Sequence, residues 1–345
     1  MRRMAYKIIW NSEIAGKVFA RSICRKRFLP FLLTAIVLVG LFSGCDMQTS
    51  GKPLIGIAWR GDTESQSYLN TVYAIESAGG IPVLLDQVIC RDLTYNEKKV
   101  LQGAADAVGA LSETSAQLLR DGTWKDSNAE KVMRNISAVV FSGGEDICPS
   151  LYGEPWHGIF EEINYNPTRD VSDYLLMTYC MDQDIPVLGI CRGMQMMAVA
   201  GGAGLIQDIP SYFASKGIHY DHLHRYLPGT PEPERSYVAH EVTVVEGSLA
   251  HEILGAKQLT GCPSLHHQAA VDVEMAGFVV SGYTQTCGEP LAEIIEHGER
   301  RFFVGLQFHP EAAAGRNAEM SDVFFERETA LAFFMALVNA AGNQG

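Results

Sequence analysis

One pattern narrows the fold of this chain more than any other: a buried strand that runs straight into a glycine-flanked cysteine. Residues 185–190 are nearly all apolar and lead into Gly189-Ile190-Cys191-Arg192-Gly193. The apolar stretch 194–200 follows directly and reads as a helix. A tight strand-to-helix turn of this kind is known as a nucleophile elbow in its Gly-x-Ser-x-Gly form. The pattern predicts an α/β protein with Cys191 at the tip of the turn.

Short apolar runs alternate with helical stretches along the rest of the chain, as is typical of α/β architecture. Strands are predicted over 53–58, 81–85, 136–141 and 302–308, and helices over 68–78, 173–181 and 320–338. The runs 136–141 and 185–190 are almost uninterrupted in apolar residues, which indicates a sheet covered on both faces. One domain, 53–342, is therefore expected. It contains a long connection, 92–134, which is predicted to hold at least one helix, because helical spacing links Val100, Leu101, Ala104, Ala105, Val108 and Leu111.

The N-terminal residues differ from the domain 53–342 in charge and in hydropathy. Residues 1–44 carry eight Lys or Arg and one acid, whereas the whole chain has a net charge of −13. The remainder is therefore strongly acidic and has no basic stripe, which argues against nucleic-acid binding. Residues 28–42 form an apolar run that is short for a membrane-spanning helix and suits a secretion signal.

The apolar run ends in Leu41-Phe42-Ser43-Gly44-Cys45, which resembles a bacterial lipobox. Phe42 departs from that pattern, because leucine usually stands there. Three outcomes stay open: lipid attachment at Cys45, simple cleavage, or an uncleaved anchor. Lipidation is favoured, so residues 1–45 are predicted to be a leader and residues 46–52 a polar tether. The protein is then expected to be exported and held at a membrane, facing away from the cytoplasm.

Thiol chemistry needs partners for Cys191, because the thiolate attacks and a base must accept its proton. Gln307-Phe308-His309-Pro310-Glu311 supplies an imidazole and a carboxylate at strand-like spacing, so both side chains are expected on one side of the chain. The amide of Arg192 is placed to stabilise an oxyanion. Ser142-Gly143-Gly144 offers further unobstructed amides. A cysteine nucleophile, a histidine base and a glutamate that orients the histidine are predicted.

These segments, in this order, resemble the class I glutamine amidotransferase superfamily, and within it the γ-glutamyl-γ-aminobutyrate hydrolase-like branch, peptidase family C26. The similarity covers roughly residues 53–340, with 92–134 longer than in the family. It includes the segments Leu54–Ile57 with Arg60, 141–153, Arg169-Asp170, 185–195, Gln207-Asp208, His240–Val242, Ser264–Gln268 and 305–311. Asp173 stands where a glutamate is usual.

The resemblance implies a flavodoxin-like three-layer αβα fold with a mostly parallel sheet. It implies a triad of Cys191, His309 and Glu311, and a γ-glutamyl thioester on Cys191 that water hydrolyses. Gly144 and Arg192 are the implied oxyanion donors. Substrate contacts or support are implied for the set Gly143, Gln195, His266, His267 and Gln268. No metal or organic cofactor is expected; a small γ-glutamyl compound is the expected partner, and homodimer formation stays open.

Two rival functions remain on the sequence alone. One is a ligand-binding lipoprotein without catalysis, and the other is a glutaminase subunit of a separate synthase. A further question concerns His219, His222 and His224, whose short spacing would allow metal binding. No carboxylate or thiol completes an obvious ligand set, so these histidines are expected at the pocket rim. None of the cysteines forms a C-x-x-C pair, which argues against a zinc knuckle.

Overall fold

A computed structural model describes residues 51–106, 108–157, 164–221, 224–226, 230, 237–315 and 323–342. The chain divides into two units, residues 1–51 and 52–345, and the second begins close to the predicted start of the body at residue 53. The leader and Cys45 lie outside the described residues. Among the described helices, none combines the length and the apolar character needed to cross a bilayer.

The second unit is built on a nine-stranded mixed sheet in the order β2-β1-β5-β6-β13-β12-β11-β8-β9. Its parallel half consists of β1 (Leu54–Ile57), β2 (Ile81–Leu84), β5 (Ala138–Phe141), β6 (Val187–Ile190) and β13 (Phe303–Leu306). Its antiparallel half consists of β8 (Val238–Val244), β9 (Gln258–Ser264), β11 (Phe278–Thr286) and β12 (Glu289–His297). The two halves meet where β12 pairs with β13.

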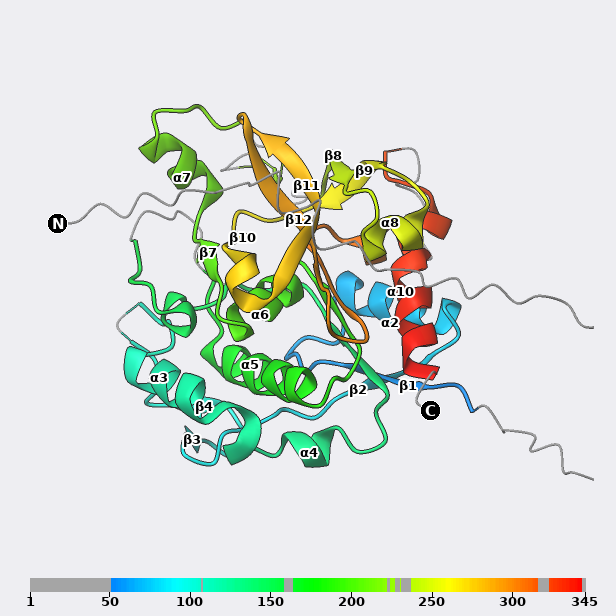
Figure 1. The fold of residues 1–345 in the computed structure, drawn as a ribbon. Helices are drawn as coiled ribbons and strands as arrows, with labels where there is room; N and C mark the ends of the chain where they lie inside the picture. Colours follow the sequence, from blue (N-terminus) through cyan, green and yellow to red (C-terminus); the bar gives the residue numbers. More distant parts are fainter. Residues whose placement is uncertain are drawn as a thin grey trace, which may run out of the picture. The chain divides into compact units, whose positions relative to one another are not determined.

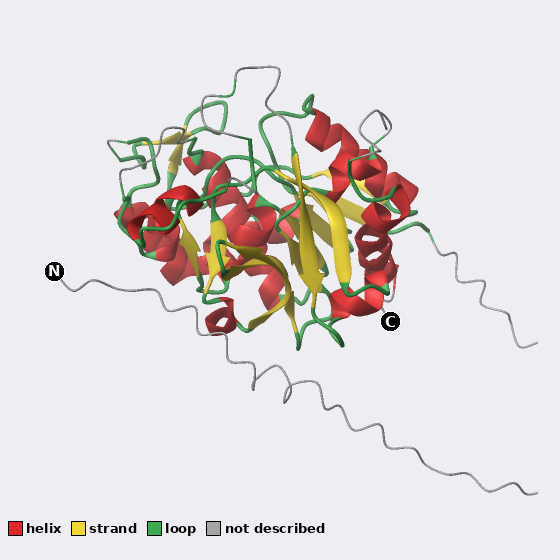
Figure 2. Ribbon diagram, turned by 90° about the horizontal axis from the view of Figure 1, so that it is seen from above, coloured by secondary structure: helices red, strands yellow, loops and turns green. Residues whose placement is uncertain are grey.

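Helices cover both faces of this sheet and make three layers (Figure 1, Figure 2). α5 (Pro167–Asp182) and α6 (Arg192–Ala200) pack on one face, and α2 (Gln66–Ser77), α8 (Leu249–Leu254) and α10 (Arg327–Gly342) on the other. Successive residues of β5 divide between the layers: Val139 and Phe141 join the first core, and Ala138 and Val140 the second. The near-continuous apolar strands follow from this two-sided burial, and the predicted three-layer α/β fold is confirmed.

Helix starts carry recognisable capping residues. The Ser65 side chain accepts a hydrogen bond from the Tyr68 amide at the start of α2, and the Asn166 side chain accepts one from the Arg169 amide at the start of α5. Pro167 occupies the first turn of α5, where its missing amide hydrogen costs nothing. The predicted helix 173–181 was therefore too short, since it begins at Pro167. The predicted terminal helix was misplaced at its start, because α10 begins at Arg327.

The connection 92–134 folds differently from the prediction in its first half. The described residues between Val100 and Leu111 are not helical: β3 (Thr94–Tyr95) and β4 (Leu101–Gln102) form a small hairpin, and a loop follows. Gly103 and Gly109 adopt positive φ values of 66° and 82°, a left-handed conformation that interrupts a helix. The helices of this connection lie later, at α3 (Glu113–Gly122) and α4 (Ala129–Val132). Several apolar residues of the loop are nevertheless buried, which accounts for the misleading spacing.

The remaining elements complete the unit around the sheet. A separate two-stranded sheet pairs β7 (Gly204–Ile206) with β10 (Ala269–Val271). α7 (Ile209–Ser215) follows β7, and the short α9 (Pro310–Ala314) follows β13. Within the described residues, 3-10 turns lie at Thr123–Asp126, Pro149–Tyr152 and Val273–Ala276.

Candidate active site

Cys191 lies where β6 ends and α6 begins, in a conformation that L-residues seldom adopt. Its φ is 50° and its ψ is −107°, and it occupies the N-cap position of α6. Backbone strain of this kind costs on the order of 1–3 kcal/mol and persists only where the surroundings enforce it. Here the turn is held by tight backbone packing around the neighbouring glycines Gly189 and Gly193. A Cβ atom on Gly193 would lie 2.2 Å from the Phe141 carbonyl oxygen, and one on Gly189 would lie 2.7 Å from the Gly193 backbone. The elbow predicted from the sequence is present.

The imidazole and the carboxylate lie at the end of the adjacent strand, β13. His309 is the N-cap of α9 and Glu311 is in its first turn, and both are buried. His309 Nδ1 donates to Glu311 Oε1 at 2.8 Å. The expectation of strand-like spacing was wrong, because Pro310 begins a helix at this point. The two side chains meet across a helix start instead.

The side chains of Cys191 and His309 converge on Gly143, which follows β5. A Cβ atom on this glycine would lie 2.6 Å from His309 Cε1 and 3.6 Å from Cys191 Cβ. Burial alone would lower the pKa of His309, yet the neighbouring Tyr237, Glu311 and Cys191 together raise that pKa well above its usual value. The His309 ring is therefore suited to hold the proton of an adjacent thiol.

The loop after β5 is held in place by a buried arginine of α5. Arg169 on α5 donates to the carbonyl oxygens of Ser142 and Gly143, each at 3.0 Å, and pairs with Glu145 at 2.6 Å. A Cβ atom on Gly144 would lie only 1.9 Å from Arg169 Nη1, so this position accepts glycine alone. The loop amides are thereby held beside the cysteine without side-chain obstruction, as an oxyanion-binding role requires.

Arg192 contributes in two ways through different atoms. It is the first residue of α6, so its backbone amide has no acceptor within the helix. Its guanidinium is fully buried and pairs with Asp170 at 2.6 Å and with Asp173 at 3.3 Å. Burial opposes the charge, but Asp173 and Asp170 raise the pKa of Arg192 above its usual value. These ion pairs join the turn at Cys191 to α5.

A cavity of about 600 Å³ opens in front of the cysteine. Residues predicted to contact substrate line it from distant parts of the sequence, together with residues that the sequence did not single out. The lining comprises Gly144, Glu145, Asp146, Asn164, Cys191, Gln195, Arg225, Tyr226, Leu265, His266, His267 and Gln268. The cavity is large enough for a small amide substrate.

His267 is held between two carboxylates at the edge of this cavity. Its Nε2 lies 2.9 Å from Asp146 Oδ1, and its Nδ1 lies 3.1 Å from Asp208 Oδ1. Burial lowers the pKa of His267, but the hydrogen bonds that its ring donates to Asp146 and Asp208 outweigh this effect and raise the pKa to about 9. The ring is therefore cationic at neutral pH and links the loop after β5 to the start of α7.

This pairing predicts a loss of stability in alkali. Because the pKa of His267 is raised on folding, its contribution is complete below the unfolded value and disappears as pH rises through about 9. At pH 6 we expect the free energy of unfolding of the parent protein to exceed that of the His267→Gln variant by up to about 3 kcal/mol. This difference is expected to shrink by pH 10. Urea unfolding of both proteins at the two pH values measures it. A difference that stays constant across this range would contradict the assignment.

Several residues with roles in this site carried no signal in the sequence. The Ser67 hydroxyl, from α2, donates to Glu311 Oε1 at 3.0 Å and so helps to orient the carboxylate. The Tyr237 ring lies 4.9 Å from the His309 ring. Asp146 was seen only as part of a longer motif. Ser67 and Tyr237 reach the site through the fold and not through a local pattern.

Neither His219 nor His224, both of which were expected at the pocket rim, lines the cavity. His219 is exposed and His222 lies outside the described residues, whereas His224 is fully buried beside Glu293. His266 lines the cavity, but its Nδ1 donates to the Gln268 carbonyl oxygen at 2.8 Å and its Nε2 faces Glu293. Gln195 donates to the same carbonyl oxygen and to the Gln307 side chain. The cysteines of the described part form no disulfide.

The three-layer fold and a cysteine, a histidine and a glutamate gathered at the ends of neighbouring strands define the class of glutamine amidotransferase-like proteins. Comparison with known proteins agrees with this class. The family model of peptidase C26 matches residues 94–311, which is more than half of the chain. The chain therefore belongs to the peptidase C26 family.

Individual relatives are more distant. Protein NtpR of Enterococcus hirae is 29% identical over 57% of this chain and 75% of its own length. The γ-glutamyl-γ-aminobutyrate hydrolase of Escherichia coli strain K12 is 27% identical over 76% of this chain and 84% of its own length. Among solved structures, a glutamine amidotransferase of Thermotoga maritima aligns with 85% of this chain and 100% of its own, with a TM-score of 0.45 and 15% identity.

Proposed function

We propose that this protein is a cysteine-dependent hydrolase of γ-glutamyl amide bonds in small compounds or peptides. The observation that carries the proposal is the buried His309–Glu311 pair, at 2.8 Å, beside a cysteine on a strained turn that opens into a cavity. The relatives named γ-glutamyl-γ-aminobutyrate hydrolase support the substrate class.

In the proposed reaction the Cys191 thiol gives its proton to His309, and the sulfur attacks the γ-carbonyl carbon. The resulting oxyanion is stabilised by the amides of Gly144 and Arg192. The C–N bond then breaks as His309 protonates the leaving amine, which leaves a γ-glutamyl thioester on Cys191. Water, deprotonated by His309, attacks the thioester and releases glutamate and the thiol. Glu311 holds the imidazole tautomer and stabilises its cation, as the acidic member of a triad does.

A substrate panel tests this proposal on the full chain. We expect release of glutamate from γ-glutamyl amides, and a γ-glutamyl mass increment on the peptide that contains Cys191 when the reaction is quenched early. The Cys287→Ala variant is the control for adventitious acylation, because Cys287 is the least buried cysteine of the described part. Binding without turnover would favour a ligand-binding protein. Ammonia release from glutamine only with an added partner would favour a synthase subunit.

The setting of the enzyme is a separate proposal, which rests on the sequence of residues 1–45. We propose that the chain is exported and carries lipid on Cys45. The Cys45→Ala variant is expected to lose metabolic labelling by a radiolabelled fatty acid and to lose the mass of the acyl groups. Labelling of the variant at the level of the parent protein would contradict lipidation at this position.

A further inference from the structure

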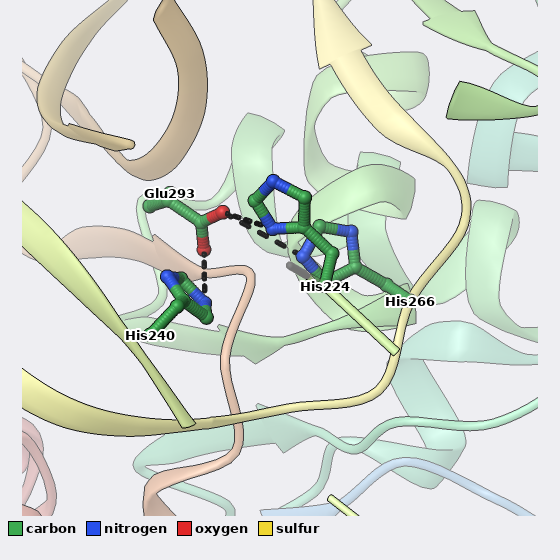
Figure 3. Close-up of side chains that lie close together, drawn as sticks. All are labelled: His224, His240, His266 and Glu293. Carbon is green, nitrogen blue, oxygen red and sulfur yellow. Dashed lines mark ion pairs between the residues drawn. The ribbon is translucent and has the colours of Figure 1, made fainter. Parts of the chain in front are cut away.

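Four buried side chains with metal-ligating atoms converge behind one wall of the cavity. His224, His240, His266 and Glu293 each offer one such atom, and these atoms all lie within 4.8 Å of one another (Figure 3). The residues come from four separate places: the segment after α7, β8, the connection after β9, and β12. We propose that they form a closed structural site for a divalent transition-metal ion, with Zn²⁺ the best match.

The spacing around the carboxylate suits such an ion. Glu293 Oε1 lies 3.2 Å from His224 Nδ1 and 3.6 Å from His266 Nε2, and Glu293 Oε2 lies 3.6 Å from His240 Nε2. Zinc bonds to nitrogen and oxygen are about 2.0–2.2 Å long, which places tetrahedral ligand atoms about 3.3–3.6 Å apart. The observed distances to the carboxylate bracket this range.

The hydrogen bonds on the far sides of two rings fix their tautomers. His266 Nδ1 faces the Gln268 carbonyl oxygen at 2.8 Å, and a carbonyl only accepts, so the proton is on Nδ1. His240 Nδ1 faces the Glu241 carbonyl oxygen and the Thr284 hydroxyl, whose own hydrogen is donated to that same carbonyl oxygen. The neutral form of each ring therefore presents a lone pair on Nε2 toward Glu293.

Lone pairs of imidazole facing a carboxylate repel each other unless a cation lies between them. Protonating one ring would relieve only one contact, and protonating all three would bury a surplus of positive charge. One divalent ion satisfies the three nitrogens and the carboxylate together. None of these facing atoms has another hydrogen-bond partner in the described part of the chain. Imidazole ligands braced by hydroxyl or carbonyl groups on their far nitrogen are the usual outer shell of zinc sites, and Thr286 Oγ1 braces His224 at 2.7 Å.

The position of the site indicates its role. All four residues are buried, and four protein ligands would fill the places of a tetrahedral ion, which is the property of a structural site. His224 precedes Arg225 and Tyr226, and His266 lies between Leu265 and His267; these neighbours line the cavity. The two segments are also joined directly, since the His266 amide donates to the His224 carbonyl oxygen at 2.9 Å. The ion would clamp this wall of the cavity to β8 and β12.

Metal analysis of the full chain, purified in mild detergent without an affinity tag, tests the inference. After removal of metal with a chelator, titration is expected to restore one Zn²⁺ per chain. Co²⁺ is expected to give the strong visible absorption of a four-coordinate ion. His240→Gln should weaken binding by more than 100-fold, and Thr284→Val, which removes only the brace, by about 10- to 100-fold. His219→Gln, an exposed histidine outside the cluster, should bind as the parent protein does.

Folding of each variant is checked by circular dichroism. If His240→Gln does not fold, the metal content of the parent protein still tests the proposal. A folded parent protein that binds far less than one ion per chain, or a folded His240→Gln that binds as tightly as the parent, would overturn the proposal. Amide hydrogen exchange tests whether the ion holds this wall of the cavity in place. The amides of residues 264–268 should exchange faster without metal, and unchanged exchange would contradict the clamp.

Discussion

Replacing Cys191 by alanine is expected to reduce turnover of γ-glutamyl amides by on the order of 10⁴-fold or more, because the nucleophile of a covalent mechanism has no substitute. The fold should tolerate the change. Cys191 is small and lies at the tip of a turn whose shape is set by Gly189 and Gly193. Its strained φ of 50° is no more costly for alanine than for cysteine. Initial rates measure the loss of turnover. Intact mass after an early quench shows whether the enzyme is still acylated.

The matched control is Cys287→Ala, which removes a thiol that does not line the cavity. Its turnover should match that of the parent protein. The alanine variant at position 191 should still bind a γ-glutamyl compound with an affinity within about tenfold of the parent, since the cavity walls are unchanged. Retained turnover in that variant would rule out the thioester mechanism and leave the fold assignment intact.

Asp170→Ala is expected to destabilise the protein by about 3–5 kcal/mol, the largest stability effect that the structure suggests for one side chain. Asp170 is fully buried; its Oδ1 pairs with Arg192 at 2.6 Å, and its Oδ2 accepts from the Cys148 amide at 3.0 Å. Removal of this carboxylate leaves the buried guanidinium with Asp173 alone at 3.3 Å. Equilibrium unfolding in urea measures the loss.

Asp182→Ala provides the comparison on the same helix, because that aspartate is exposed and accepts a hydrogen bond from its neighbour Gln183. It should change the free energy of unfolding by no more than about 0.5 kcal/mol. Asp170→Asn keeps an acceptor for the Cys148 amide and should fall between the two. A loss below about 1 kcal/mol in Asp170→Ala would mean that the ion pair contributes little to fastening the elbow.

The parts of this molecule that the sequence predicts well are those determined by a local pattern. The strand-to-helix turn at Cys191 follows from glycines at positions where any Cβ would clash. The buried strands follow from uninterrupted apolar runs. The family resemblance was confirmed by the match over residues 94–311. Local pattern misled where burial and helical spacing coincide by chance, as over Val100–Leu111, because two glycines with positive φ decide that segment.

Contacts between distant segments could not be foreseen. Glu293 lies among ordinary apolar residues of β12, and no spacing links it to His224 or His240. The sequence showed no carboxylate near His224 for this reason: the carboxylate that lies beside His224 comes from β12. Ser67 and Tyr237 are similar cases, since each reaches the His309–Glu311 pair through packing.

The mixed sheet has a consequence for how this scaffold can diversify. The reacting groups stand on the carboxyl ends of parallel strands, whereas one side of the cavity is supplied by segments next to the antiparallel strands β8, β9 and β12. Altering Arg225, Tyr226 or Leu265 therefore changes the cavity wall and leaves Cys191, His309 and Glu311 in place. Reactivity and selectivity can then evolve, or be engineered, independently of each other.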